Sequence, residues 1–119
     1  MDLQQARQHV IELEQQLLDP AVCADTARFD ALLDPSFVEY GASGLAAQSS
    51  TGCPCKTMQQ PGLAAFGFRE RIVAGVAILL TYGSTSNERT CNRSSHWVES
   101  TPGIWRTQFH QGTQTTPAN

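Results

Sequence analysis

The fold of this chain is decided by residues 66–82, which read FGFRERIVAGVAILLTY. Over residues 66–73 the side chains follow the two-residue period of a β-strand. Ala74 and Gly75 predict a turn, and the apolar run 76–82 has the length and composition of a strand at the centre of a sheet. Two strands joined by so short a connection pair antiparallel.

Two further strands are predicted downstream. Residues 84–87 are polar and predict a turn, and Thr101-Pro102-Gly103 predicts another. Strands at 88–99 and 104–112 are separated by the second of these turns. Four consecutive strands with short connections predict an antiparallel meander.

Two helices are predicted before the sheet. Asp2 caps the first, with Gln5 at the capping-box position, and Asp19-Pro20 ends it. A second helix is capped by Asp25, ends at Asp34-Pro35 and leads into a short strand at 36–40. The first helix carries an apolar face with steps of three and four residues, at Leu3, Ala6, Val10, Leu13 and Leu17. Helices that precede strands without alternating with them predict an α+β fold, with the first helix covering one face of the sheet.

Residues 45–63 contain several helix and strand breakers and no hydrophobic period: Gly52, Pro54, Pro61 and Gly62 interrupt any long element. We expect a long loop there, with a helical turn near residues 45–48.

Composition limits the possible functions. The chain has 119 residues and a net charge of −3, so we expect one domain over residues 1–113 and a flexible tail at 114–119. The basic residues form no run, which argues against nucleic-acid binding. The longest apolar stretch, 72–80, is too short to cross a bilayer, and no secretory signal opens the chain, so we expect a cytoplasmic protein without membrane contact. Cys53-Pro54-Cys55 lacks zinc-site spacing, and we expect no metal and no cofactor.

Three segments resemble a nuclear transport factor 2-like family of unknown function. They read LLDPSFVEYG at residues 32–41, RSSHWV at 93–98 and WRTQFHQGT at 105–113. The resemblance implies a cone-shaped fold in which a curved, mostly antiparallel sheet has N-terminal helices on one face and a pocket between them. It also implies a homodimer formed through the sheet. Residues 42–62 depart from the family pattern, which has a third helix there.

The same superfamily includes ketosteroid-isomerase-like and polyketide-cyclase-like enzymes. The resemblance places Tyr40 where the isomerase has its carboxylate base, and a phenol is a poor base near pH 7. Glu39 would point to the opposite face of the strand, where we expect it to be solvated. No Asp follows Asp34, so the second oxyanion donor of that mechanism is also missing. The isomerase mechanism is therefore disfavoured.

The candidate site residues follow from an assumed register of the last two strands, with Val98 opposite Trp105. In this register Val98, Trp105 and Phe109 face the helices. The predicted pocket residues are Tyr40, Tyr82, Asn92, His96 and Gln111, and the predicted dimer contact on the outer face comprises Arg93, Trp97, Arg106 and His110. A slip by one residue would exchange the two faces.

Three functions are compatible with these residues. The favoured one is a small-molecule-binding or protein-interaction domain, whose ligand would be a small apolar molecule. The second is an isomerase-, cyclase- or hydrolase-like enzyme on a small apolar or carbonyl substrate, with His96 and either Tyr40 or Tyr82 as acid and base. The third is a structural dimer whose pocket is filled by its own side chains.

Overall fold

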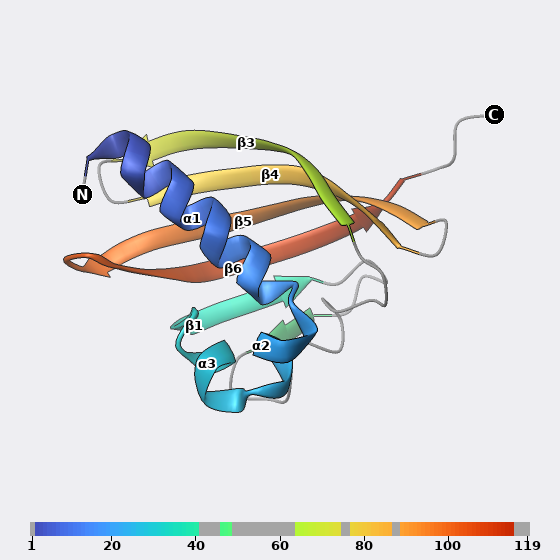
Figure 1. The fold of residues 1–119 in the computed structure, drawn as a ribbon, viewed down its shortest axis with the longest axis horizontal. Helices are drawn as coiled ribbons and strands as arrows, with labels where there is room; N and C mark the ends of the chain where they lie inside the picture. Colours follow the sequence, from blue (N-terminus) through green and yellow to red (C-terminus); the bar gives the residue numbers. More distant parts are fainter. Residues whose placement is uncertain (1, 41–45, 49–63, 75–76, 87–88, 116–119) are drawn as a thin grey trace.

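A computed structural model describes residues 2–40, 46–48, 64–74, 77–86 and 89–115. The elements are α1 (Leu3–Leu17), α2 (Pro20–Ala24), α3 (Thr26–Asp30), β1 (Leu33–Tyr40), β2 (Ala46–Gln48), β3 (Ala64–Ala74), β4 (Ala77–Ser86), β5 (Arg89–Thr101) and β6 (Ile104–Gln114). The long helix α1 crosses one face of the sheet, and α2 and α3 lie beside β1 (Figure 1). The predicted α+β architecture, with helices covering one face, is confirmed.

Helix α1 begins and ends where the sequence predicts. The Asp2 side chain accepts a hydrogen bond from the Gln5 backbone, and the Gln5 side chain accepts one from the Asp2 backbone. These two bonds satisfy donors that the first turn of a helix leaves unpaired. The side chains of Asp19 and Asp25 accept a backbone hydrogen bond at the starts of α2 and α3. The helix predicted from Asp25 is the short α3, which ends at Asp30 and not at Asp34, and α2 is a helix that the sequence analysis did not predict.

The sheet has the strand order β2-β1-β6-β5-β4-β3. Strands β3 to β6 form the predicted antiparallel meander, and β1 pairs parallel to β6. The helical turn expected near residues 45–48 was wrong for Ala46–Gln48, which form a strand paired with Val38–Tyr40. Strand β4 runs on to Ser86, through most of the turn predicted at 84–87.

The register of the last two strands differs from the expected one. Val98 pairs with Arg106, and Glu99 pairs with Trp105. A register shift between His96 and Trp97 then adds a second offset, so that His96 pairs with Phe109. The prediction fixed the register from the turn alone, and a bulge inside a strand leaves no mark in a two-residue pattern.

The core lies between α1 and the inner face of the sheet. It contains apolar side chains from every helix and from four strands, among them Val10, Leu17, Phe29, Phe37, Ile78, Leu80, Trp97 and Trp105. Ile72 of β3 packs against this cluster. An ion pair of 3.5 Å between Arg7 Nε and Glu70 Oε1 also joins α1 to β3. In the described part of the chain, no helix is both long and apolar enough to cross a membrane.

Candidate functional site

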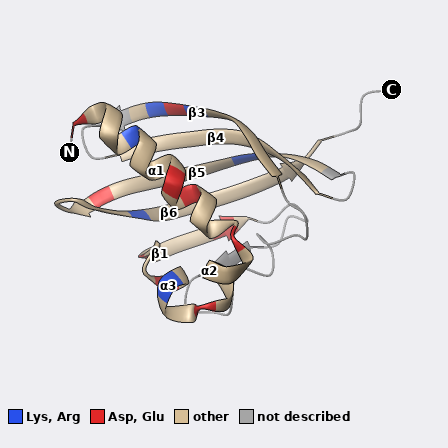
Figure 2. Cartoon of the chain, in the orientation of Figure 1, with Lys and Arg blue, Asp and Glu red and all other residues tan. Residues whose placement is uncertain are grey.

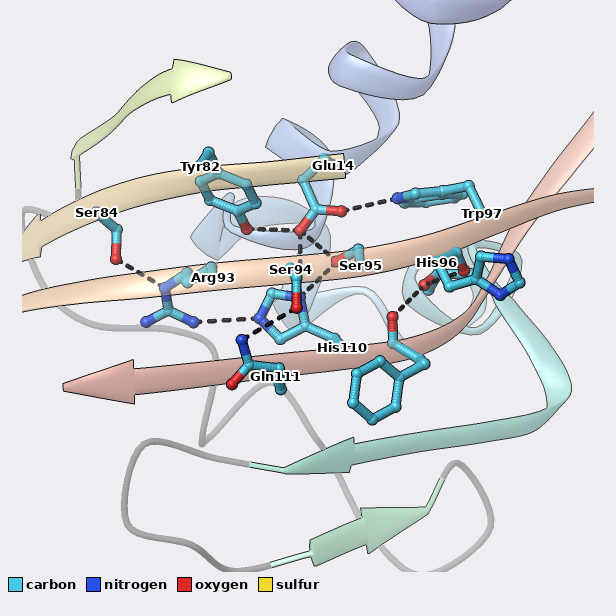
Figure 3. Close-up of polar contacts among 12 residues, drawn as sticks. Glu14, Tyr82, Ser84, Arg93, Ser94, Ser95, His96, Trp97, His110 and Gln111 are labelled. Atoms are coloured by element: carbon cyan, nitrogen blue, oxygen red, sulfur yellow. Dashed lines mark hydrogen bonds and ion pairs between the residues drawn. The ribbon is translucent and has the colours of Figure 1, made fainter. Parts of the chain in front are cut away.

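Glu14 of α1 is the centre of a buried polar network on the inner face of the sheet (Figure 3). Its side chain is fully buried, and three donors from the sheet end on its carboxylate. Tyr82 Oη and Ser95 Oγ donate to Oε2 over 2.5 and 2.9 Å, and Trp97 Nε1 donates to Oε1 over 2.8 Å. The network therefore fastens the middle of α1 to β4 and β5.

His110 of β6 joins this carboxylate to Arg93 of β5. The guanidinium can only donate, so Nε2 of His110 accepts from Arg93 Nη1 over 3.3 Å. The ring proton then lies on Nδ1, which is 2.6 Å from Ser95 Oγ and 3.3 Å from Glu14 Oε2. A chain of donors runs in one direction, from Arg93 through His110 and Ser95 to Glu14. Arg93 Nε also donates to Ser84 Oγ over 2.7 Å.

The electrostatics of the network favour an ionised Glu14. Burial alone would raise the pKa of its carboxyl group, but hydrogen bonds from His110, Tyr82 and Trp97 outweigh burial and lower that pKa below 4.5. Burial and the neighbouring Glu14 carboxylate raise the pKa of Tyr82 well above 10. Tyr82 therefore remains a neutral donor to an anion, and it is not poised to act as a base.

Glu39 of β1 also lies on the inner face, contrary to the expectation that it is solvated. Its side chain is 1% exposed. Burial raises the pKa of its carboxyl group to about 8, although the nearby Arg93 guanidinium acts in the opposite direction. Phe37, two residues earlier, is buried on the same face, and the alternation of a strand carries Glu39 there with it.

The structure exchanges the faces of most of the predicted site residues. Arg93, Trp97 and His110, expected on the outer face, are between 0 and 3% exposed in the interior. Only Arg106 of that group lies on the outer face, where it pairs with Val98 and is half-buried. These placements follow from the register correction described above.

The predicted pocket residues lie on different faces. Tyr82 points to Glu14 on the inner face. Asn92, His96 and Gln111 lie in alternate positions to the buried Arg93, Ser95 and His110, so they belong to the outer face. Tyr40 is also on this face, 49% exposed, with its ring edge-on to that of Phe109 at 5.7 Å.

A hollow of about 430 Å³ lies on the outer face, near the end of β4 that leads to β5. The residues that line it come from four strands: Phe66 and Gly67 of β3, Thr81 and Gly83 of β4, Asn92 and Ser94 of β5, and Gln111 of β6. Tyr82 and Arg93 lie between these residues along β4 and β5 and also belong to the lining. Their side chains, however, end on the inner face. Of the predicted pocket residues, Tyr82, Asn92 and Gln111 line the hollow, and only Asn92 and Gln111 do so with side chains on the outer face.

The rest of the outer face carries an apolar patch. We define the outer patch as Val38, Tyr40, Leu79, Val98 and Phe109, all half-buried or exposed and drawn from four strands. His96 lies among them, opposite both Leu79 and Phe109. In the view of Figure 2, basic and acidic residues are scattered over several elements and form no stripe.

Sequence reasoning missed Glu14, Ser84 and Ser95 as site residues. Glu14 stands four residues after Val10 and three before Leu17, so a helical period places it on the buried stripe with them. That spacing was a usable signal, because a carboxylate on an apolar stripe needs donors. Ser84 and Ser95 gave no comparable signal, since small polar residues occur throughout strands and turns.

Comparison with known proteins supports the fold. No family model matches the sequence, and no curated protein matches it. Solved structures that match are nuclear transport factor 2-like and cystatin-like proteins, so the chain has a nuclear transport factor 2-like fold. This is the fold class that the sequence resemblance implied.

Three of the solved structures illustrate the range of proteins that share this fold. A nuclear transport factor 2-like protein from Cytophaga hutchinsonii is 13% identical, with 97% of this chain and 100% of that chain covered and a TM-score of 0.74. A candidate ketosteroid isomerase from Parabacteroides distasonis is 15% identical, with coverages of 92% and 88% and a TM-score of 0.68. The calcium/calmodulin-dependent kinase II hub homology domain of Chlamydomonas reinhardtii is 14% identical, with coverages of 93% and 99% and a TM-score of 0.67. Likeness at this level of identity concerns the fold alone.

Proposed function

We propose that this protein is a non-enzymatic binding domain whose ligand site is the hollow on the outer face. The proposal rests on the burial and hydrogen bonding of the acid and base groups in the protein interior. Glu14, Tyr82, Ser95 and His110 are at most 4% exposed, and each is hydrogen-bonded to another member of the network. Groups that are buried and paired in this way stabilise a fold, whereas catalysis needs them to reach a substrate.

The hollow, in contrast, presents polar groups that are exposed to solvent. Asn92 is exposed, and its amide has no hydrogen-bond partner within the described ranges. The hollow has a volume of about 430 Å³, which is in the range of small-molecule sites. Polar groups that converge on a hollow without internal partners are available to a ligand.

The test is a fragment screen followed by ¹H–¹⁵N correlation spectra. We expect at least one fragment to shift the amides of Thr81, Asn92, Ser94 and Gln111 in a saturable way, and to leave those of α1 unchanged. A Δ5-3-ketosteroid, assayed by the absorbance of its conjugated product, should show no turnover above buffer. Turnover that is lost in Tyr82→Phe, or a library that never reaches the hollow, would contradict the proposal.

A homodimer is a second candidate, and it rests on a different observation. The outer patch leaves Tyr40 49% exposed on a sheet face that α1 does not cover. An exposed cluster of aromatic and aliphatic side chains is typical of a protein interface. We propose that two copies pair through the outer patch, next to the hollow.

A further inference from the structure

We infer that the hollow on the outer face binds a neutral polyhydroxylated ligand of monosaccharide size, stacked on Phe66. This inference rests on the proposed function, since it names the ligand class of the same site. It differs from the apolar ligand that the sequence suggested.

Phe66 supplies the stacking surface. Its side chain is 50% exposed, and its ring lies directly on the backbone of the neighbouring strand at Gly83. A Cβ atom at Gly83 would be 2.6 Å from Cζ and 2.7 Å from Cε2 of the ring, so only glycine permits this position. The ring therefore lies on the strand and is half open to solvent. The negative face of an aromatic ring attracts the positively polarised C–H groups of a sugar ring.

The backbone of β3 accounts for the place of this ring. Gly67 has a φ of 69°, a left-handed conformation that favours glycine. The β3–β4 register shifts between Phe66 and Arg69 at this point. Such a bulge re-aims the neighbouring side chain. Two glycines on two strands thus fix one aromatic ring beside the polar lining.

The polar lining can both donate and accept. Gln111 Nε2 donates to Ser94 Oγ over 3.0 Å, and Gln111 Oε1 accepts from Thr113 Oγ1 over 2.8 Å. These bonds orient the amide and leave one N–H of Gln111 and the hydroxyl proton of Ser94 for a ligand. Asn92 adds a complete amide, and Thr81 adds a hydroxyl group. Adjacent hydroxyls of a sugar are themselves donors and acceptors, so they match such a surface.

Charge argues against an ionic ligand. Among the lining residues that the structure describes, Arg93 is the only charged one, and its guanidinium is bonded to Ser84 and His110 on the inner face. A phosphate or carboxylate group would find no free cation among these described lining residues, and an ammonium group would find no carboxylate; the exposed Arg69, opposite Thr81, lies beside the lining and is not part of it. A purely apolar ligand would make no use of the amides of Asn92 and Gln111 or of the hydroxyl groups of Ser94 and Thr81.

The experiment is a titration of the ¹⁵N-labelled protein with D-glucose, D-galactose, D-mannose and N-acetyl-D-glucosamine, each up to about 100 mM. Because few groups contact the ligand in an open hollow, we expect at least one sugar to bind with a Kd of about 1–10 mM. The shifted amides should be those of Thr81, Asn92, Ser94 and Gln111. Adenosine, cyclohexanol and glutamate serve as aromatic, apolar and charged comparison ligands under the same conditions.

Two variants test the stacking contact. Phe66→Ala should weaken sugar binding at least tenfold, because it removes the exposed ring of the hollow, whereas the Tyr82 side chain ends at Glu14 on the inner face. Gly83→Ala should weaken it to a similar degree while Phe66 is still present, because the new methyl group displaces the ring. Ile104→Ala, a comparably exposed apolar side chain in another part of the sheet, is the matched control and should leave binding unchanged.

One variant tests the polar contact. Asn92→Ala should weaken binding about three- to tenfold, the effect of one or two lost hydrogen bonds. Unchanged Kd values in Asn92→Ala and Gly83→Ala would overturn the assignment of the site. Hollow-specific binding of adenosine or cyclohexanol with no sugar bound would overturn the ligand class and leave the proposed function standing. If none of the seven compounds reached the hollow while a library fragment did, the sugar inference alone would fall.

Discussion

At Glu39 a carboxyl group is held inside the protein at a pKa of about 8, against 4.5 for an exposed glutamate. Arg93, Tyr82 and Cys23 are among the ionisable groups that interact with it. The folded state therefore keeps a proton on Glu39 between about pH 4.5 and 8, where the unfolded chain has lost it. Over that window, stability falls as the pH rises.

This gives a prediction for Glu39→Gln. The wild-type free energy of unfolding should decrease by up to about 1.4 kcal/mol per pH unit across the window, and then level off above about pH 8. The glutamine variant should lack this decrease and be the more stable protein at pH 8. Urea unfolding at several pH values measures both.

Glu12→Gln is the control for that series, because Glu12 is exposed on α1. It should keep the wild-type slope. A Glu39→Gln profile that is parallel to wild type would mean that Glu39 is ionised in the folded protein.

At the scale of one element, α1 depends on Glu14. Glu14→Gln would place an amide N–H₂ among the donors of Tyr82, Ser95 and Trp97. We expect a loss of about 3–5 kcal/mol in the free energy of unfolding, as for a buried charged group whose partners are left unsatisfied. Glu12→Gln, two residues away and exposed, should change it by less than about 0.5 kcal/mol. Chemical denaturation separates these values, and a cost below 1 kcal/mol for Glu14→Gln would contradict the network.

The elements show how far sequence reasoning reached. The capping box of α1 and the existence of the strand β3 are local features, and both were predicted correctly, but the register shift between Phe66 and Arg69 interrupts the two-residue period expected of β3. The register of β5 on β6 was predicted wrongly, because the shifts between Glu99 and Thr101 and between His96 and Trp97 depend on packing between strands. Since one residue of register exchanges the faces, Trp97 and His110 were expected outside and lie inside. Buried groups such as Ser84 and Ser95 become meaningful only once their distant partners are known.

At the scale of the whole molecule, the outer patch predicts a homodimer. Sedimentation equilibrium at micromolar concentration should give twice the chain mass of 13.0 kDa. Leu79→Lys places a charge in the patch and should shift the protein to the monomer. Thr113→Lys, exposed on β6 outside the patch, is the matched control and should leave the dimer intact. A mass of 13.0 kDa at all concentrations, or a dimer that Leu79→Lys does not weaken, would contradict this prediction.

The long reach of the Glu14 network has a consequence for the newly made chain. The three sheet donors to Glu14 lie 68, 81 and 83 residues later in the sequence, and β1 pairs with β6, the last strand described. At roughly 5–20 residues per second, the ribosome delivers these partners on the order of ten seconds after the helix. During that interval α1 exposes its apolar stripe, and β1 has no parallel neighbour to pair with. During synthesis the N-terminal third therefore exposes apolar surface until the last strands have been made, and we expect it to be open to chaperone binding in that interval.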